Sequence, residues 1–339
     1  MIKSEKIVKN GDFFMPNNKV MVSVACMAYN HEKYIRQALD SILSQETDFE
    51  FEILVHDDAS TDGTAEIVSE YAAKYSNIIP IIEEENIYSQ GYNVVLPLLR
   101  RARGKYMIVL ECDDFWLDHS KLQKQVEYME NHPEMSACAH QTLAYNVLSG
   151  KTWLMAKNQN DCNISLDDVI KRNNVYHLSS MLFRTDIYNK FFECMKNVEW
   201  LYTPGEYAME IFFLFYGKVH YFDEIMTFYR RYSSESSWTY QYHILDKNES
   251  INRKMLESTI RMFRIFDEWT SYKYHRLMER AISSRIFALN DYKCELKDLN
   301  DRYMRKYFIY EMPIRKKMYV VLSNTPLYAI YKMKKNTSK

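Results

Sequence analysis

Tyr106-Met-Ile-Val-Leu110 runs directly into Glu111-Cys-Asp-Asp114, so an unbroken apolar run ends in three carboxylates within four residues. A half-buried strand alternates apolar and polar residues, so the unbroken run predicts a strand that is buried on both faces of a sheet. The carboxyl ends of such strands form the edge where open α/β folds bind ligands. Three neighbouring negative charges repel each other, and a divalent cation that bridges to phosphate is the simplest group to balance them. The alternative for this stretch alone is an acidic turn that ends the strand.

The composition is that of a soluble globular protein. Of the 339 residues, 47% are hydrophobic and 26% are charged, which allows one large domain with an appendage, or two domains. The formal net charge of -1 provides no field that would attract nucleic acid. The six cysteines lack paired short spacings, so we expect reduced thiols in the cytoplasm and neither a zinc site nor disulfides. A polar N-terminus and the lack of a run of ~20 apolar residues predict neither a secretory signal nor a membrane span.

Strands and helices are predicted to alternate up to Pro133. Apolar runs over 20–26, 51–56, 78–82 and 106–110 are predicted strands. Helical spacing follows each run, over 34–43, 67–75, 93–103 and 122–129. Asn30 is a predicted N-cap of the first helix, and Ser120 with Gln123 predicts a capping box for the fourth. This alternation predicts a parallel sheet with helices on both faces.

The second half of the chain has a less regular pattern. We predict strands over 135–144, 176–183, 219–222 and 226–229, and helices over 166–172 and 205–215. From about Tyr240 onward the pattern is helical. Residues 301–339 contain ten Lys/Arg and two acids, a net charge of +8, around the apolar stretch 318–331. Basic flanks around an apolar stretch indicate a helix on an anionic membrane surface, and the alternative is a basic tail that packs against the acidic half of the protein.

Polar residues follow three of the predicted strands, where parallel strands would bring them to one edge. They are Ala28-Tyr29-Asn30, Asp57-Asp58, and Glu111 with Asp113 and Asp114. An aromatic ring can stack on a base, a carboxylate can bind a base N–H or ribose hydroxyls, and a metal with oxygen ligands can neutralise a diphosphate. Neither G-x-G-x-x-G nor G-x-x-x-x-G-K-[ST] is present, which argues against a dinucleotide dehydrogenase and a P-loop enzyme. The pattern favours a nucleotide whose diphosphate is held by a cation.

These three motifs, in this order and spacing, resemble the inverting glycosyltransferases of family 2. The resemblance covers residues 20–235, in Val22-Ser-Val-Ala-Cys-Met-Ala-Tyr-Asn30, Glu52-Ile-Leu-Val-His-Asp-Asp-Ala-Ser-Thr-Asp-Gly63 and Glu111-Cys-Asp-Asp114. It implies an α/β fold of the GT-A (Rossmann-like) type, with a mixed, mostly parallel sheet flanked by helices. It also implies a nucleotide-sugar donor and Mg²⁺ or Mn²⁺. The expected domains are 1–238, with a nucleotide-sugar half at about 20–130 and an acceptor half at about 131–238, and a helical, basic region at 239–339.

The resemblance also implies roles for individual residues at the donor site. Tyr29, between Ala28 and Asn30, would stack on the base, and Asp58 would contact the base N–H with Asp57 beside it. Asp113 would lie near the ribose and the metal, and Asp114 would be the direct metal ligand. Glu111 stands where the family commonly has Asp, and Arg101 or Arg103 would contact the sugar or the phosphates.

The resemblance places the catalytic base at the start of the apolar helix that follows the acceptor loop. This position is Glu206, with Glu210 one helical turn later as the alternative. An inverting transfer needs such a base to deprotonate the acceptor hydroxyl. His177, Ser179 and Ser180 are candidates for lining the acceptor pocket, or for a structural hydrogen-bonded cluster. The family's Tyr-Arg-x-His ending is Tyr229-Arg-Arg-Tyr232 here, so Arg230 or Tyr232 would have to replace the histidine.

The resemblance therefore implies a metal-dependent inverting glycosyltransferase that moves one sugar from a donor, expected to be UDP-linked, to a saccharide or lipid-linked saccharide. The lack of Gln-x-x-Arg-Trp argues against a processive synthase. The setting implied is bacterial envelope or capsule synthesis in the cytoplasm, with membrane-surface contact through 301–339. The alternatives are a non-catalytic nucleotide-sugar-binding or scaffold protein of the same fold, and a sugar nucleotidyltransferase, whose Gly-rich N-terminal loop is missing here.

Overall fold

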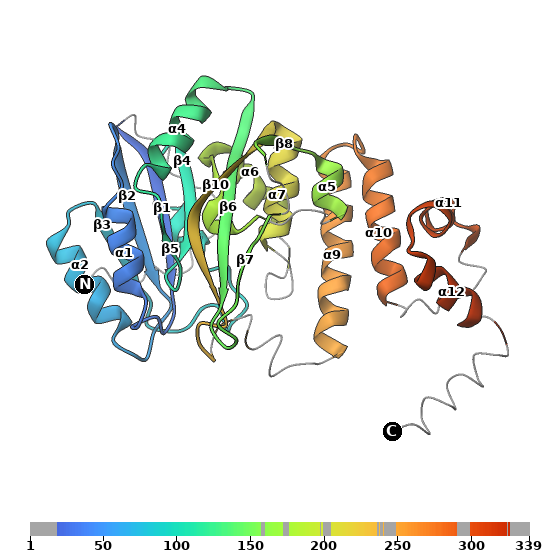
Figure 1. Cartoon of the computed structure of the whole chain (residues 1–339), viewed down its shortest axis with the longest axis horizontal. Coiled ribbons are helices and arrows are strands. Elements are labelled where there is room, and N and C mark those ends of the chain that lie inside the picture. The colour runs from blue at the N-terminus through green and yellow to red at the C-terminus, as the bar shows by residue number, and fades with distance from the viewer. Residues whose placement is uncertain are drawn as a thin grey trace. The chain divides into compact units, whose positions relative to one another are not determined.

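The computed structural model describes residues 19–156, 160–171, 176–196, 205–235, 249–289 and 299–323, with residues 198, 237, 240 and 325. The chain divides into two compact units (Figure 1). The first contains residues 1–196 and 205–247, and the second contains residues 197–204 and 248–339. The first unit is α/β, and the described part of the second is helical.

One mixed sheet runs through the first unit (Figure 1). Its strand order is β3-β2-β1-β4-β9-β6-β10-β5. The strands are β1 (Val20–Ala28), β2 (Glu50–Asp57), β3 (Ile78–Ile82), β4 (Tyr106–Glu111), β5 (Phe115–Trp116), β6 (Met135–Asn146), β7 (Thr152–Leu154), β8 (Cys162–Ile164), β9 (Leu182–Arg184) and β10 (Lys218–Arg231). The first four strands of the sheet order are parallel to one another, and β10 is parallel to β6. The short β9 is antiparallel to both of its neighbours and joins the two halves. The α/β fold with a mixed sheet is confirmed.

Helices cover both faces of the sheet because successive side chains of a strand point to opposite faces. They are α1 (Ile35–Leu43), α2 (Thr64–Lys74), α3 (Leu96–Leu99), α4 (Lys121–Asn131), α5 (Leu166–Lys171), α6 (Thr185–Met195) and α7 (Gly205–Tyr216), with a 3₁₀ turn at Leu178–Ser180. On one face α1, α2 and α4 pack on a fully apolar core that includes Val22, Val24 and Leu182. The side chain of Phe183 points to the opposite face of the sheet. Its ring centroid lies 4.7 Å from that of Tyr188 of α6 and 5.1 Å from that of Phe213 of α7.

The register of the parallel strands decides where their ends lie. Ala28, the last residue of β1, is paired with Asp57, the last residue of β2. Met27 is paired with Glu111, the last residue of β4. The predicted convergence of three polar strand ends at one edge is therefore present in the backbone.

Three predicted elements differ from the observed ones. The helix predicted over 93–103 is only α3, because the amides of Arg103 and Gly104 donate to the side chains of Glu52 and Ser23 instead of continuing a helix. The two strands predicted over 219–229 are one strand, β10, whose pairing with β6 shifts register within the span 218–227. The strand predicted over 176–183 is a 3₁₀ turn followed by β9.

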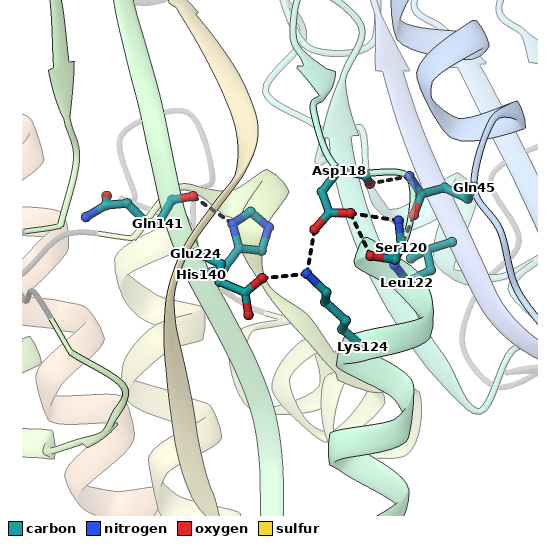
Figure 2. A network of polar contacts seen from close by, with 8 residues as sticks. All are labelled: Gln45, Asp118, Ser120, Leu122, Lys124, His140, Gln141 and Glu224. Atoms are coloured by element: carbon teal, nitrogen blue, oxygen red, sulfur yellow. Dashed lines mark hydrogen bonds and ion pairs between the residues drawn. The ribbon is translucent and has the colours of Figure 1, made fainter.

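The N-terminus of α4 also differs from its prediction, since it has no capping box. Gln45, from the end of α1, accepts a hydrogen bond from the Leu122 amide (3.0 Å) and donates to the Asp118 carbonyl (2.7 Å) (Figure 2). The Ser120 hydroxyl donates to the Asp118 carboxylate (2.7 Å). Lys124 joins that carboxylate (2.8 Å) to Glu224 of β10 (2.5 Å), as Figure 2 shows. The cap is thus provided by a residue that is distant in sequence, which a local motif cannot predict.

The second unit contains α9 (Glu249–Trp269), α10 (His275–Leu289), α11 (Arg302–Lys306), a π-helical turn (Tyr307–Glu311) and α12 (Ile314–Ser323). Phe287, Met304, Met312 and Val320 form a small buried core among the last four of these. None of the described helices is long and apolar enough to cross a membrane. Apart from residue 325, the part of the predicted apolar stretch beyond 323 lies outside the described residues.

Candidate active site

The ends of β1 and β2 are held together by the residues predicted to bind the nucleoside. The Ala28 carbonyl accepts from the Asp58 amide (3.0 Å), and the Asp57 carboxylate accepts from the amide (3.1 Å) and hydroxyl (2.5 Å) of Ser60. Asn30 lies in the left-handed region (φ 56°), and its Oδ1 accepts from the Thr61 amide (2.8 Å) rather than capping α1. These contacts fix two loops at the strand ends.

Tyr29 lies between the two fixed residues Ala28 and Asn30, and its side chain is partly exposed. A partly exposed ring on a rigid loop is available for stacking on a base, and that role of Tyr29 stays a prediction.

Asp58 is buried, and its carboxylate holds a third loop. Its two oxygens accept from the amides of Ile87 (2.8 Å) and Tyr88 (3.1 Å). Tyr88 is 41% exposed overall, but its hydroxyl end is buried. This burial is the larger cause of a raised pKa of the phenol, and the negative charge of Glu111 is the smaller one. Asp58 therefore brings Tyr88 near the acidic end of β4. No sequence pattern singled out Tyr88.

In the acidic motif after β4, two buried oxygens have no hydrogen-bond donor within the described part of the chain. Asp113 Oδ2 accepts from the Ser233 hydroxyl (2.6 Å), and Asp114 Oδ1 accepts from the Arg230 amide (2.8 Å). Among the described residues, no group donates to Asp113 Oδ1 or to Asp114 Oδ2. An unsatisfied buried carboxylate oxygen is costly, so these two atoms have the chemistry expected of cation ligands.

The pKa shifts of the motif indicate the same need for positive charge. Burial, followed by the charges of Asp113 and Glu111, raises the pKa of Asp114 well above its usual range. Burial, followed by the charges of Asp113 and Glu206, raises the pKa of Glu111 to about 8. At neutral pH these carboxyl groups must therefore retain protons or share a cation.

His177 completes a potential metal site with two of these acids. The site contains Glu111, Asp114 and His177. Each offers one ligand atom, and these three atoms lie within 4.8 Å of one another. The His177 Nδ1 is hydrogen-bonded to the Ser179 hydroxyl (2.5 Å), and its Nε2 lies 3.6 Å from Asp114 Oδ2. Burial lowers the pKa of His177 to about 4, so the imidazole is neutral at pH 7 and can offer a lone pair to a metal.

Ser179 and Ser180 support this arrangement rather than an open acceptor pocket. Both residues are buried, and the Ser180 hydroxyl donates to the His177 carbonyl (2.7 Å). Ser179 orients the imidazole through the hydrogen bond to Nδ1. The structure thus brings His177 to the acidic motif, and the two serines hold it there.

Arg230 holds the loop that carries the acids, and its replacement of the family's histidine stays a prediction. Its guanidinium donates to the Asp113 carbonyl and to Gln37 Oε1 (2.6 Å). It also lies over the rings of Tyr34 (4.9 Å) and Phe115 (4.8 Å). The second predicted substitute, Tyr232, adopts a left-handed backbone (φ 63°) in the turn that follows β10. Among the described residues, the histidine grouped with the acids is His177, from the turn before β9.

Arg103 does not join the other predicted donor-site residues. Its guanidinium pairs with the buried carboxylate of Glu52 (2.5 Å), which also accepts from the Ser23 hydroxyl (2.6 Å). Ser23 and Glu52 are register partners near the amino ends of β1 and β2, opposite the edge that carries Asp57. Arg103 therefore neutralises a buried carboxylate at the far edge of the sheet. The charge of the alternative, Arg101, acts on His56 of β2.

The two candidate bases occupy different surroundings on α7. Glu206 is in the first turn and is exposed, and its charge contributes to the raised pKa values of Glu111 and Tyr229. Glu210 is 8% exposed and lies among Ile164, Val169 and other apolar side chains. Of the two, only Glu206 combines exposure with electrostatic proximity to the acidic motif.

The sequence is similar to several curated proteins, including one of Mycobacterium tuberculosis and one of Bacillus subtilis. The uncharacterized protein Rv1520 of Mycobacterium tuberculosis H37Rv is 33% identical over 214 residues, which cover 62% of this chain and 59% of the relative. The putative teichuronic acid biosynthesis glycosyltransferase TuaG of Bacillus subtilis is 35% identical over 136 residues, 40% of this chain and 50% of the relative. The chain thus matches less than two thirds of the length of either relative.

Among solved structures, residues 1–349 of S. aureus TarS, crystallised with UDP-GlcNAc, have a similar fold. The TM-score is 0.59 at 17% identity, and the match covers 90% of this chain and 88% of that one. At this identity the similarity concerns the fold, which is the expected GT-A type. The family model for glycosyl transferase family 2 matches residues 23–192, which include all three strand-end motifs and His177. The chain belongs to glycosyl transferase family 2.

Proposed function

We propose that this protein is a metal-dependent, inverting hexosyltransferase that moves one sugar from a UDP-sugar to a saccharide or lipid-linked saccharide. The observation that supports it most strongly is the pair of unsatisfied buried oxygens, Asp113 Oδ1 and Asp114 Oδ2, at the ligand-binding edge of the sheet. TarS, with a similar fold, was crystallised with UDP-GlcNAc. In a glycosyltransferase, a cation beside this edge is expected to meet the donor diphosphate.

The residues at the strand ends would bind the donor. Tyr29 would stack on the base, and the loops fixed by Asp57 and Asp58 would enclose the nucleoside. Glu111, Asp114 and His177 would hold Mn²⁺ or Mg²⁺, with Asp113 near both the ribose and the metal. When bound, the cation neutralises charge on the leaving diphosphate.

Glu206 would act as the general base. Its exposed carboxylate would take the proton of the acceptor hydroxyl as that oxygen bonds to the anomeric carbon, while UDP departs with the electron pair of the broken bond. Attack from the side opposite the leaving group inverts the anomeric centre. Glu206 lies on the first turn of α7 and is exposed, so an acceptor hydroxyl can reach its carboxylate.

The proposed setting is synthesis of a bacterial envelope or capsule polysaccharide at the cytoplasmic face of the membrane. It follows from the similarity to TuaG, named for teichuronic acid biosynthesis, and from the basic C-terminal region. Contact with the membrane surface would bring the active site to lipid-linked acceptors.

A panel of nucleotide sugars tests this proposal. We expect a UDP-sugar to raise the melting temperature with Mn²⁺ but much less with EDTA, because bound ligand stabilises the folded state. With the matching donor and an acceptor, release of UDP should depend on the metal. Metal-dependent binding without turnover on any lipid-linked or free saccharide would support the non-catalytic alternative instead.

The His177→Gln variant should change metal preference. A nitrogen ligand favours Co²⁺ and Mn²⁺ over Mg²⁺, so its loss should weaken Co²⁺ binding by about tenfold or more and Mg²⁺ binding less. Calorimetry and the Co²⁺ absorption spectrum measure the change directly. His220→Gln is the matched control, because His220 packs against Tyr128 (4.2 Å) and is not among the grouped ligands. Equal losses for all three metals would exclude His177 as a ligand.

Metal affinity should also rise with pH. Burial and the neighbouring acids raise the pKa of Glu111 to about 8, so this group retains its proton at pH 6 and loses it as the pH passes about 8. Binding of a cation must displace this proton, so Mn²⁺ should bind more weakly at pH 6 than at pH 8, with release of protons. Calorimetry in buffers of different ionisation enthalpy measures both effects. An affinity that is constant over this range would contradict the expected coupling.

A further inference from the structure

One side of α12 exposes a continuous apolar stripe. Ile314 is 74% exposed, Met318 58%, Val321 50% and Leu322 43%. Their spacing of i, i+4, i+7 and i+8 places them on one side of a helix that turns by about 100° per residue. The buried Val320 lies on a different side and belongs to the core of the second unit. The helix is thus anchored by one side and presents a second apolar side.

The preceding π-helical turn extends the exposed apolar surface. Its residues Ile309 and Tyr310 are 48% and 78% exposed. We call the six residues together the α12 face: Ile309, Tyr310, Ile314, Met318, Val321 and Leu322. Single exposed apolar side chains are ordinary, but six within fourteen residues form a patch of the kind that marks an interaction site.

Cations border the apolar stripe on both sides. Measured around the helix from Ile314, Arg315 lies about 100° to one side and Lys317 about 60° to the other. The Lys317 ammonium donates to the Ile309 carbonyl (2.6 Å), which connects the helix to the preceding turn. Flanking basic side chains can extend beside an apolar stripe and place their charges at the level of lipid headgroups.

The surrounding charge is positive. Residues 301–323 contain six Lys/Arg and two acids, a net charge of +4. One of the acids, Glu311, is paired with Arg280 of α10 (2.9 Å). This charge opposes the approach of a second copy of the same face and favours an anionic surface.

We propose that the α12 face lies in the headgroup region of an anionic lipid bilayer. The apolar stripe would enter the boundary with the acyl chains, while Arg315 and Lys317, which border the stripe, would meet lipid phosphates. The helix lies along the surface and does not span it, in agreement with the lack of a membrane-spanning helix among the described residues. This contact is independent of the donor site, so each can be tested without the other.

Co-sedimentation of the full chain with vesicles tests the proposal. Vesicles of phosphatidylcholine with phosphatidylglycerol should bind the protein, and vesicles of phosphatidylcholine alone should bind it much less. The triple variant I314S/M318S/V321S should lower the partition coefficient by about tenfold or more, because buried methylene groups drive interfacial binding. Arg315→Glu with Lys317→Glu should abolish the preference for the anionic lipid.

The matched control replaces exposed leucines that lie elsewhere. Leu148 and Leu154 are 57% and 50% exposed in the first unit, and L148S/L154S should bind vesicles as the unchanged protein does. Circular dichroism and thermal melting would show that each variant is folded. The proposal is overturned if folded protein ignores anionic vesicles, or if the triple variant and the control bind equally. A triple variant that only converts a dimer to a monomer would assign the α12 face to a second copy of the chain.

Discussion

Glu206→Gln should lower turnover by about 10²-fold or more and leave the affinity for the UDP-sugar nearly unchanged. The amide has the size of the carboxylate but cannot take the acceptor proton, so the loss falls on the chemical step. Glu206 is the exposed acid on the first turn of α7, and it contributes to the raised pKa of Glu111. Single-turnover kinetics, with donor affinity measured separately, would divide the effect between binding and chemistry.

Glu210→Gln is the matched control for this prediction. Glu210 is one helical turn further along α7 and is buried beside Ile164 and Leu214. The Glu210→Gln substitution makes the same chemical change on the same helix, and we expect nearly normal turnover of the folded variant. If the Glu206 variant has normal turnover and the Glu210 variant loses most of it, the general base is Glu210.

The parts of the site that could be predicted from sequence are those that depend on local pattern. The unbroken apolar run of β4 and its acidic end predicted a buried strand that reaches a ligand-binding edge. The register of Met27 with Glu111 and of Ala28 with Asp57 agrees with that prediction. Periodicity also predicted the apolar helix α7, which carries Glu206.

The parts that could not be predicted are contacts between segments distant in sequence. Ser233 reaches Asp113 across 120 residues, and the Arg230 amide reaches Asp114 across 116. His177 meets Asp114 only because β9 enters the sheet between β4 and β6. A pattern in one segment carries no information about its partner in another.

Arg103 illustrates the opposite error, in which a charged residue close in sequence to a motif is assigned to it. It precedes β4 by only a few residues, but the acidic motif follows that strand, so the length of the strand separates them. The buried Glu52 provides a sufficient structural reason for a cation at this position. A charge near the amino end of a strand and one after its carboxyl end belong to different edges of the sheet.

Replacing Asp114 or Asp113 by Asn should remove metal-dependent donor binding. Asn keeps the size of the side chain and an oxygen that can accept from the Arg230 amide or the Ser233 hydroxyl, but it removes the negative charge that a cation requires. The loss should be at least the ~10–100-fold that removal of an outer-sphere partner typically costs. Calorimetric titration of UDP, with Mn²⁺ and with EDTA, measures the metal-dependent part of the affinity.

The structure also predicts the stability of these variants, which separates loss of a ligand from loss of the fold. Without metal, burial and the neighbouring acids raise the pKa values of Glu111 and Asp114. An acid whose pKa is raised in the folded state is destabilising at neutral pH, and Asn removes that cost, so the metal-free variants should melt at or above the temperature of the metal-free wild type. Asp48→Asn, which removes an exposed charge just before β2 at the opposite edge, should leave both UDP affinity and its response to Mn²⁺ unchanged. If Asp114→Asn instead unfolds readily, or binds UDP with the full Mn²⁺ response, the carboxylate acts on the Arg230 loop and not on a cation.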